Sequence, residues 1–184
     1  MKKLSEVTWK AFDIQEVFPE IKRGRRLKTE DHIPGSMPYV SSSAIDNGVD
    51  DFVSNKEGVR IFEDCISLAN SGSVGASFYH PYQFVASDHV TKLKNPECNK
   101  YIYLFLSTIT SRLSEKYSFN REINEGRLNR EKILVPVSES GQPDYDFMEQ
   151  YMKAIEKKLL KRYQQYLVET KRNLLTNKKL TGGG

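Results

Sequence analysis

The sequence predicts an α+β protein in which a mixed, sheet-rich body is followed by one long C-terminal helix. Short runs of large apolar and β-branched residues, separated by Gly, Pro and Asn-Gly turn signals, fill residues 1–143. Only one segment of that body, from Tyr101 to about Tyr117, has apolar residues at helical spacing. Residues from 144 to about 175 contain neither Pro nor Gly. We therefore expect a body at 1–143 and a helix at 144–184.

The predicted strands follow one another along the body. Trp9–Ile14 alternates apolar and polar side chains, as a half-buried strand does. A turn at Ile33–Pro38 leads to a short strand, Tyr39-Val40, and Asn47-Gly48 signals the next turn. Further extended segments are expected at Val59–Phe62, Cys65–Ala69, Ala76–Tyr79 and Phe84–Ala86, and the nearly continuous apolar run Cys65–Ala69 is expected to be central.

Length and composition indicate one domain with an appendage. The chain has 184 residues and a mean hydropathy of −0.59. No apolar run approaches the roughly 20 residues that span a bilayer. The first residues lack the apolar stretch of a signal peptide, so we expect a cytoplasmic protein with no membrane contact. Cys65 and Cys98 form no Cys-x-x-Cys pair, and we expect both to be free thiols.

Charge is distributed unevenly between the two parts. Residues 144–184 hold nine Lys or Arg and five Asp or Glu, whereas residues 1–143 hold nineteen of each. Bulk charge therefore does not predict that the body binds nucleic acid, and only local clusters of cations can do so.

Several patterns imitate catalytic motifs without meeting their requirements. Asp144 and Glu156 resemble the acids of a metal-dependent nuclease, but twelve residues of helix separate them by about 18 Å. Pro143-Asp144 is instead typical of a helix start. Asn95-Pro96 only begins an amino-methyltransferase motif, and we expect a turn there. His80, beside Pro81, is expected in a loop. We predict no catalytic residue, no metal site and no cofactor.

The strongest candidate for nucleic-acid contact is a basic segment between residues 22 and 28. It places five cations in seven residues, with Gly24 allowing close approach of the backbone: Lys22, Arg23, Arg25, Arg26 and Lys28. Arginine offers bidentate geometry to phosphate or guanine. The competing interpretation is an exposed loop beside the acids Glu30 and Asp31.

Two further segments are weaker candidates. Cations between 112 and 132 alternate with aromatic and amide side chains, and Arg121, Arg127 and Asn129 are the selected contacts. Acidic residues lie between these cations, so a surface salt-bridge network is as well supported as nucleic-acid contact. The glycine loop Asn70–Gly75 contains Ser71 and Ser73 and is suited to presenting N–H groups to phosphate, or to making a tight turn between strands.

The C-terminal helix carries one straight apolar stripe. Its members step by 4, 3, 4, 4 and 3 residues and are Met148, Met152, Ile155, Leu159, Tyr163 and Tyr166. A helix this long cannot bury its own stripe, so we expect it to meet another surface. Cations on its other faces are interpreted either as a solvated face or as contacts to DNA or an acidic partner.

The order of these segments resembles the target-recognition domain of restriction–modification specificity subunits, of type I and of BcgI-like systems. The resemblance rests on Trp9…Phe12-Asp13-Ile14…Ile21–Gly24, Pro38–Ser43, Ser71–Gly75 and Leu128…Ile133–Val137 ahead of a long helix. It implies a mixed α/β module that reads double-stranded DNA, with Ser42 among the residues that contact the DNA. It also implies that the helix acts as a spacer and docking element.

The resemblance also implies a division of labour. This chain would recognise sequence, while a DNA methyltransferase subunit and a nuclease or motor subunit would carry S-adenosylmethionine, Mg²⁺ and ATP. Type I subunits carry two modules and two helices, whereas this sequence shows one of each. We therefore expect one of three arrangements: a half-subunit that pairs as a homodimer on a bipartite site, a truncated subunit, or the subunit of an enzyme that reads a single site. Type I and BcgI-like membership both remain open, although the residues between Pro136 and Gln150 favour the latter.

The alternative function is a protein-interaction module that binds no DNA and oligomerises through its helix. It predicts a partner captured without nucleic acid and no sequence preference on DNA.

Overall fold

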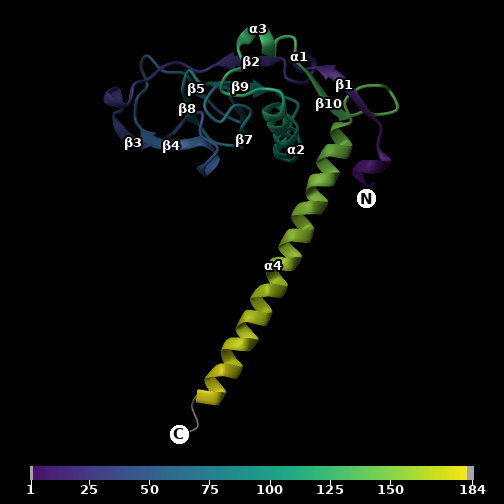
Figure 1. Cartoon of the computed structure of the whole chain (residues 1–184). Helices are drawn as coiled ribbons and strands as arrows, with labels where there is room; N and C mark the ends of the chain where they lie inside the picture. Colours follow the sequence, from purple (N-terminus) through teal and green to yellow (C-terminus); the bar gives the residue numbers. More distant parts are fainter. Residues whose placement is uncertain (1, 182–184) are drawn as a thin grey trace.

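The structure, a computed structural model, describes residues 2–181, with side chains through residue 171. Figure 1 shows a body of small sheets and short helices from which one long helix, α4, extends as a rod. Helix α4 leaves the body beside β1 and β10, and β3 and β4 lie at the opposite end. The predicted α+β class, with a sheet-rich body and a long C-terminal helix, is confirmed.

The central sheet is antiparallel and has the order β2-β9-β6-β7. Its strands are β2 (Glu20–Arg23), β9 (Val90–Lys94), β6 (Cys65–Ala69) and β7 (Ser77–His80). All five residues of β6 are buried, which confirms the prediction that this apolar run is central. Helix α2 (Lys100–Ser111) packs on β6 and β7, and Asn99 caps its N-terminus by accepting from the N–H groups of Tyr101 and Ile102.

A second sheet has the order β4-β3-β8-β5, with β3 and β8 parallel. Its strands are β4 (Val49–Val53), β3 (Pro34–Val40), β8 (Phe84–Ala86) and β5 (Ile61–Phe62). A two-stranded antiparallel sheet pairs the first and last strands of the body, β1 (Trp9–Asp13) and β10 (Lys132–Pro136). The body also contains two short helices, α1 (Ile14–Val17) and α3 (Glu125–Leu128). Its 3₁₀ turns lie at Leu4–Glu6, Thr29–Asp31, Asp46–Gly48 and Arg112–Glu115.

The main core connects the body to the long helix. It contains Ile14 of α1, Leu106 of α2 and Val135 of β10, together with Met148 of α4. Helix α4 (Tyr145–Thr181) begins where its sequence predicts, because the Asp144 carboxylate accepts from the N–H of Phe147 at 2.9 Å. Its 37 residues correspond to about 55 Å. Residues 182–184 of the predicted helix lie outside the described part.

Three local predictions are wrong. The turn expected at Ile33–Pro38 is mostly strand, because β3 already begins at Pro34. The prolines are tolerated since β8 pairs only with Tyr39 and Val40, so the earlier part of β3 has a free edge. Helix α2 ends at Ser111 rather than near Tyr117 and continues as a 3₁₀ turn.

The third wrong prediction concerns His80, which lies on β7 and is fully buried instead of occupying a loop. Its Nε2 lies 2.8 Å from the Ser67 hydroxyl and its Nδ1 lies 3.2 Å from the Tyr82 hydroxyl. Burial lowers the pKa of His80 to about 4, so the imidazole is neutral at pH 7.

Both cysteines are free thiols, as predicted, and the structure shows that both are buried. Burial raises the pKa of each thiol to about 12, which makes Cys65 and Cys98 poor nucleophiles. Among the described residues, no helix is both long enough and apolar enough to cross a membrane.

Candidate nucleic-acid interface

The basic segment 22–28 is fixed to the body by its backbone while its cations are exposed. Lys22 and Arg23 end β2, and the Gly24 and Arg25 N–H groups donate to the carbonyls of Val90 and Ala86 at 2.7 and 3.0 Å. A Cβ at Gly24 would lie 2.0 Å from the Ser87 carbonyl oxygen. Gly24 therefore permits close approach to the chain's own backbone, and the expected approach to a ligand is not what requires it.

Lys22 and Arg23 border a pocket of about 620 Å³ in which donors predominate. Its lining comes from five separate parts of the chain and includes Lys22, Arg23, Arg60, Asn70, Thr91 and Asn129, with Glu125 as its acid. The structure thus brings the first basic segment and Asn129 of the second to one site. We call it the donor pocket; such a lining suits phosphate oxygens or base acceptors.

Asn70 lines the donor pocket and has one buried side-chain donor without a partner in the part of the chain that the structure describes. Its side-chain carbonyl accepts from the Thr91 hydroxyl at 2.9 Å, and its backbone carbonyl accepts from the Ile123 N–H at 2.9 Å. Its side-chain nitrogen is buried and has no hydrogen-bond partner among the described residues. A buried donor without a partner is costly, and a ligand acceptor or water would satisfy it.

Arg60 is a member of the donor pocket that sequence reasoning missed. Its Nη1 donates to the Arg23 carbonyl at 2.5 Å, and Arg23 Nε in turn donates to the Asp88 carbonyl. These bonds orient both guanidinium groups along the pocket's edge. Arg60 is a lone cation before a two-residue strand, so the sequence held no signal for it.

Arg26, Lys28 and Ser42 border a second hollow of about 710 Å³. This hollow is mixed in charge, because it also holds Glu30, Asp50, Asp51 and Asp88. Lys28 Nζ pairs with Glu30 at 3.1 Å, and His32 Nδ1 lies 2.6 Å from the Asp51 carboxylate. The expected competition from neighbouring acids is therefore present here, and the donor pocket is the better site for an anion.

The glycine loop is a tight turn between β6 and β7 that packs on residues 41–43. The N–H groups of Ser73 and Gly75 donate to the carbonyls of Ser42 and Ala69. Ser71 is buried, and its hydroxyl lies 2.5 Å from His89 Nδ1, so its side chain is engaged within the body. The expected contact of Ser71 with DNA stays a prediction. Ser73 remains exposed, away from the donor pocket.

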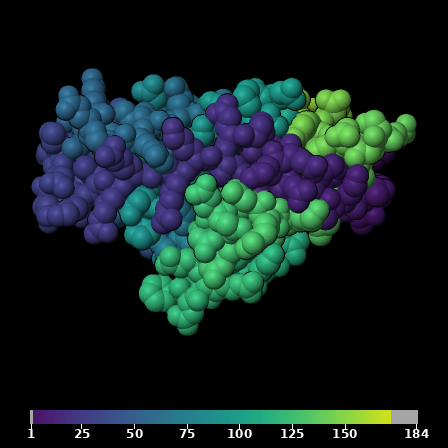
Figure 2. All heavy atoms as spheres, turned by 90° about the horizontal axis from the view of Figure 1, so that it is seen from above, coloured from purple at the N-terminus to yellow at the C-terminus, as the bar shows by residue number. Residues whose placement is uncertain are grey.

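The second basic region is partly a salt-bridge network and partly free. Lys116 pairs with Glu131, and Lys132 with Asp13, at 2.8 and 3.2 Å. Arg121 is exposed and forms no ion pair with a described side chain, and Arg127 Nη1 donates to the Glu122 carbonyl at 2.5 Å. Figure 2 shows that the green segment containing α3 projects beside the purple N-terminal segment. Both basic regions therefore border one face of the body.

The stripe on α4 is divided between two environments. Met148 is fully buried in the chain's own core, so it is not available as the interface residue that was expected. Met152 and Ile155 are half-buried. Leu159, Tyr163 and Tyr166 are 56%, 59% and 61% exposed and form an outer patch on one face of the helix, which Leu160 and Leu167 flank on one side.

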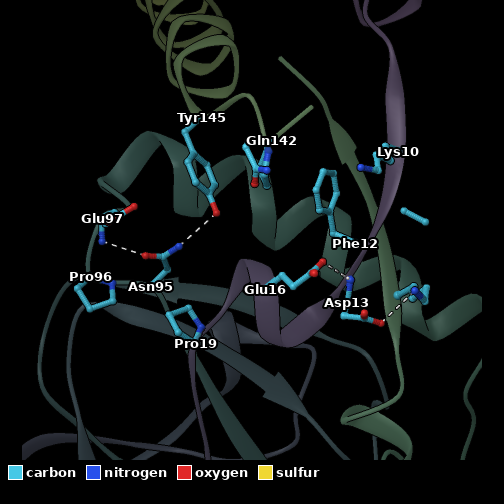
Figure 3. Close-up of a pocket in the computed structure, with 13 residues that line it drawn as sticks. Lys10, Phe12, Asp13, Glu16, Pro19, Asn95, Pro96, Glu97, Gln142 and Tyr145 are labelled. Carbon is cyan, nitrogen blue, oxygen red and sulfur yellow. Dashed lines mark hydrogen bonds and ion pairs between the residues drawn. The ribbon is translucent and has the colours of Figure 1, made fainter. Parts of the chain in front are cut away.

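The turn after Asn95 locks the start of α4 to the body. The Asn95 side chain accepts from the Glu97 N–H at 3.0 Å and donates to the Val17 carbonyl and the Tyr145 hydroxyl at 3.0 and 3.2 Å. Figure 3 shows Asn95 beside Tyr145 in a pocket that extends to Phe12 and Gln142. The predicted turn is confirmed, and the Asn95 side chain links this turn to Val17 and to Tyr145 at the start of α4. Among the described residues, no cluster of His, Cys, Asp or Glu is suited to a metal ion.

The sequence of this chain is 35% identical over 164 residues to the type II restriction enzyme specificity subunit S.BcgI from Heyndrickxia coagulans. That match covers 88% of this chain and 48% of S.BcgI, so the chain spans about half the length of this relative.

Two solved structures share the fold. The type I restriction–modification S subunit from M. genitalium aligns with a TM-score of 0.61 and 16% identity, over 99% of this chain and 51% of that one. The HsdS subunit from Thermoanaerobacter tengcongensis aligns with a TM-score of 0.56 and 14% identity, over 85% and 40%. The family model for the type I restriction modification DNA specificity domain matches residues 6–165. This chain therefore belongs to the type I restriction modification DNA specificity domain family.

Proposed function

We propose that this chain is a sequence-specific DNA-recognition subunit of a restriction–modification system. Its body binds double-stranded DNA, and its outer helix joins it to a second copy. It carries no chemistry of its own and directs methyltransferase and nuclease subunits to a bipartite site in the cytoplasm. Those partner subunits hold the cofactors that methyl transfer and cleavage require.

The donor pocket is the observation that carries the proposal. Three separated segments supply Lys22, Arg23, Arg60 and Asn129 to one concave surface, although the body as a whole has no excess of cations. Phosphate contacts set the position of a protein on DNA, and amide or guanidinium groups read base edges. Such a local concentration of donors in a neutral body favours a nucleic-acid site over general surface charge.

The exposed half of α4 supports pairing with a second copy. Leu159, Tyr163 and Tyr166 form an unpartnered apolar line on a helix that projects from the body. Two chains joined there by a two-fold axis would present two identical DNA-reading bodies at a fixed separation. The expected target is a two-fold symmetric sequence interrupted by unread base pairs.

Selection from a randomised duplex library tests the proposal directly. The purified chain is mixed with the library, and the bound duplexes are sequenced after several rounds. We expect one motif to be enriched, with binding that weakens steeply as salt rises. Binding without any sequence preference, together with capture of a partner in the absence of DNA, would contradict DNA recognition and support the protein-interaction alternative.

A pair of matched double variants tests which cations contact DNA. Arg25→Ala with Arg26→Ala removes two exposed cations from the body, and Lys157→Ala with Lys158→Ala removes two from α4. We expect the body variant to weaken binding about 10-fold or more and to lower the salt slope by about 2, and the helix variant to stay within about twofold of wild type. Equal losses in both variants would place α4 on DNA. Unchanged affinity in the body variant would remove Arg25 and Arg26 from the interface.

A further inference from the structure

Phe119 has an exposure that packing does not explain. At 75% it is the most exposed large apolar side chain among the described residues. Single exposed apolar residues are common on protein surfaces, so exposure alone indicates nothing. Phe119 differs from such residues in how the chain around it is held and in what surrounds it.

Phe119 stands at the tip of a closed turn. The Arg121 N–H donates to the Ser118 carbonyl at 2.8 Å, and the Ser118 N–H donates back to the Arg121 carbonyl at 3.3 Å. This two-way pairing leaves Phe119 and Asn120 as the tip residues. The backbone pairing therefore fixes the direction of the Phe119 Cα–Cβ bond.

Both flanks of the turn are anchored in the body. On one side the buried Tyr117 donates its hydroxyl to Glu131 at 2.6 Å, and Lys116 donates to the same carboxylate at 2.8 Å. Burial raises the pKa of Glu131, but the bonds from Lys116 and Tyr117 outweigh it and hold the pKa below its ordinary value. On the other side Ile123 is buried and its N–H donates to the Asn70 carbonyl.

The surroundings of the turn suit a polyanion. The Arg121 guanidinium lies 5.6 Å from the Tyr117 ring and has no acidic partner among the described side chains. Ile123 and Asn129, just beyond the turn, line the donor pocket together with Lys22 and Arg23. Phe119 is thus an exposed aromatic ring on a hydrogen-bonded turn, and the chain that follows this turn contributes Ile123 and Asn129 to the donor pocket.

We propose that Phe119 is a wedge that stacks on a base pair of bound duplex DNA and partly opens one base step. This inference rests on the proposed function and deepens it by naming the residue that deforms the DNA. Proteins that bend DNA insert apolar side chains between base steps, and an aromatic ring recovers part of the lost stacking. Pre-mounting the ring on a fixed turn lowers the entropic cost of insertion.

The test uses the duplex enriched by selection, with 2-aminopurine placed at successive positions across and beside the motif. Wild-type protein should raise the fluorescence at one step, where the probe loses a stacked neighbour. Phe119→Ala should abolish that rise and weaken binding about 10-fold without changing the salt slope, because no charge is removed. Phe119→Trp should retain both the rise and the affinity.

Phe52→Ala is the matched control. Phe52 is an aromatic residue that is 53% exposed on β4, and its neighbour Asp51 lines the mixed-charge hollow, so Phe52 faces the other side of that strand. We expect this variant to behave as wild type. Circular dichroism melting of each variant checks that the fold is intact, since neither exposed ring supports the core.

The outcomes separate this inference from the proposed function. If wild type enriches a motif while Phe119→Ala matches wild type in both affinity and 2-aminopurine fluorescence, the wedge is wrong and DNA recognition stands. If Phe119→Ala binds DNA normally but no longer captures a methyltransferase subunit, Phe119 is a protein contact and the wedge is wrong. If wild type shows no sequence preference, both proposals fail together.

Discussion

The two halves of helix α4 carry the same apolar pattern and use it differently. In the first three turns Met148 is fully buried in the core of the body, and Met152 packs against that core. In the outer half Leu159, Tyr163 and Tyr166 are more than half exposed. An unbroken helical period therefore identifies one face of a helix but does not say what covers that face.

The change occurs near Glu156. Its carboxylate accepts from the Tyr101 hydroxyl at 2.8 Å and from Lys100 Nζ at 3.4 Å. The next stripe residue, Leu159, is already exposed. The root of α4 is thus part of the body's stability, whereas the outer half is available for association.

Met148→Ala is expected to have the largest effect. The substitution leaves a cavity in the core that joins α2, β10 and α4, and Met→Ala changes in cores cost about 2–5 kcal/mol. Urea unfolding of the variant measures this loss. A variant as stable as wild type would show that the root of α4 is not part of the body.

Acid is expected to weaken the body through His80. Its pKa is lowered by burial from 6.5 to about 4, so stability is complete above the unfolded value and is lost as pH falls from about 6.5 to about 4. The shift corresponds to about 3 kcal/mol of unfolding free energy.

Urea unfolding at pH 7, 6, 5 and 4.5 measures the contribution of His80. His80→Gln keeps polar contacts without titrating in this range, so its stability should fall less than that of wild type. If the unfolding free energy falls with pH equally in both proteins, His80 protonates as readily in the folded state as in the unfolded state.

Removing the outer patch is expected to abolish self-association and leave the body's melting temperature unchanged. Leu159→Ser, Tyr163→Ser and Tyr166→Ser together should raise the dimer Kd about 100-fold or more, which is about 2.7 kcal/mol. Analytical ultracentrifugation over a concentration series measures it.

The matched control for the patch is a triple variant on the opposite face of α4, Lys157→Ser, Lys161→Ser and Gln164→Ser, which should associate as wild type does. A patch variant that still dimerises, or one that melts earlier, would contradict the division of the stripe.

The smallest effect is expected at the boundary. Tyr101→Phe removes the hydroxyl that donates a hydrogen bond to the Glu156 carboxylate. Exposed polar contacts of this kind contribute little to the free energy of unfolding. Differential scanning calorimetry should show a melting temperature within about 2 °C of wild type. A larger fall in melting temperature would mean that the part of α4 packed on the body reaches beyond Glu156.

Much of the fold was predictable because it depends on local pattern. The run Cys65–Ala69 is uninterrupted by charge and became the central strand, and Pro143-Asp144 marked the start of α4. Strand β9 was missed because Lys92 and Lys94 interrupt its apolar residues, and its place is fixed by pairing with β2 and β6. Pairing between distant segments is not encoded in local composition.

The site was predictable only as separate pieces. Lys22 and Arg23 form a dense cluster in the sequence, and Asn129 lies in a second one, but their meeting depends on how α3 packs beside β2. Arg60 had no sequence signal, and burial of Ser71 follows from its contact with His89. Residues that a motif suggests must therefore be sorted by the tertiary structure.

The measurement that tests the account most directly is light scattering on the complex of wild-type protein with its selected duplex, combined with the sequence of that duplex. We expect two chains on one duplex and a two-fold symmetric motif whose central base pairs are not read. One chain on an asymmetric motif would contradict pairing through the outer half of α4.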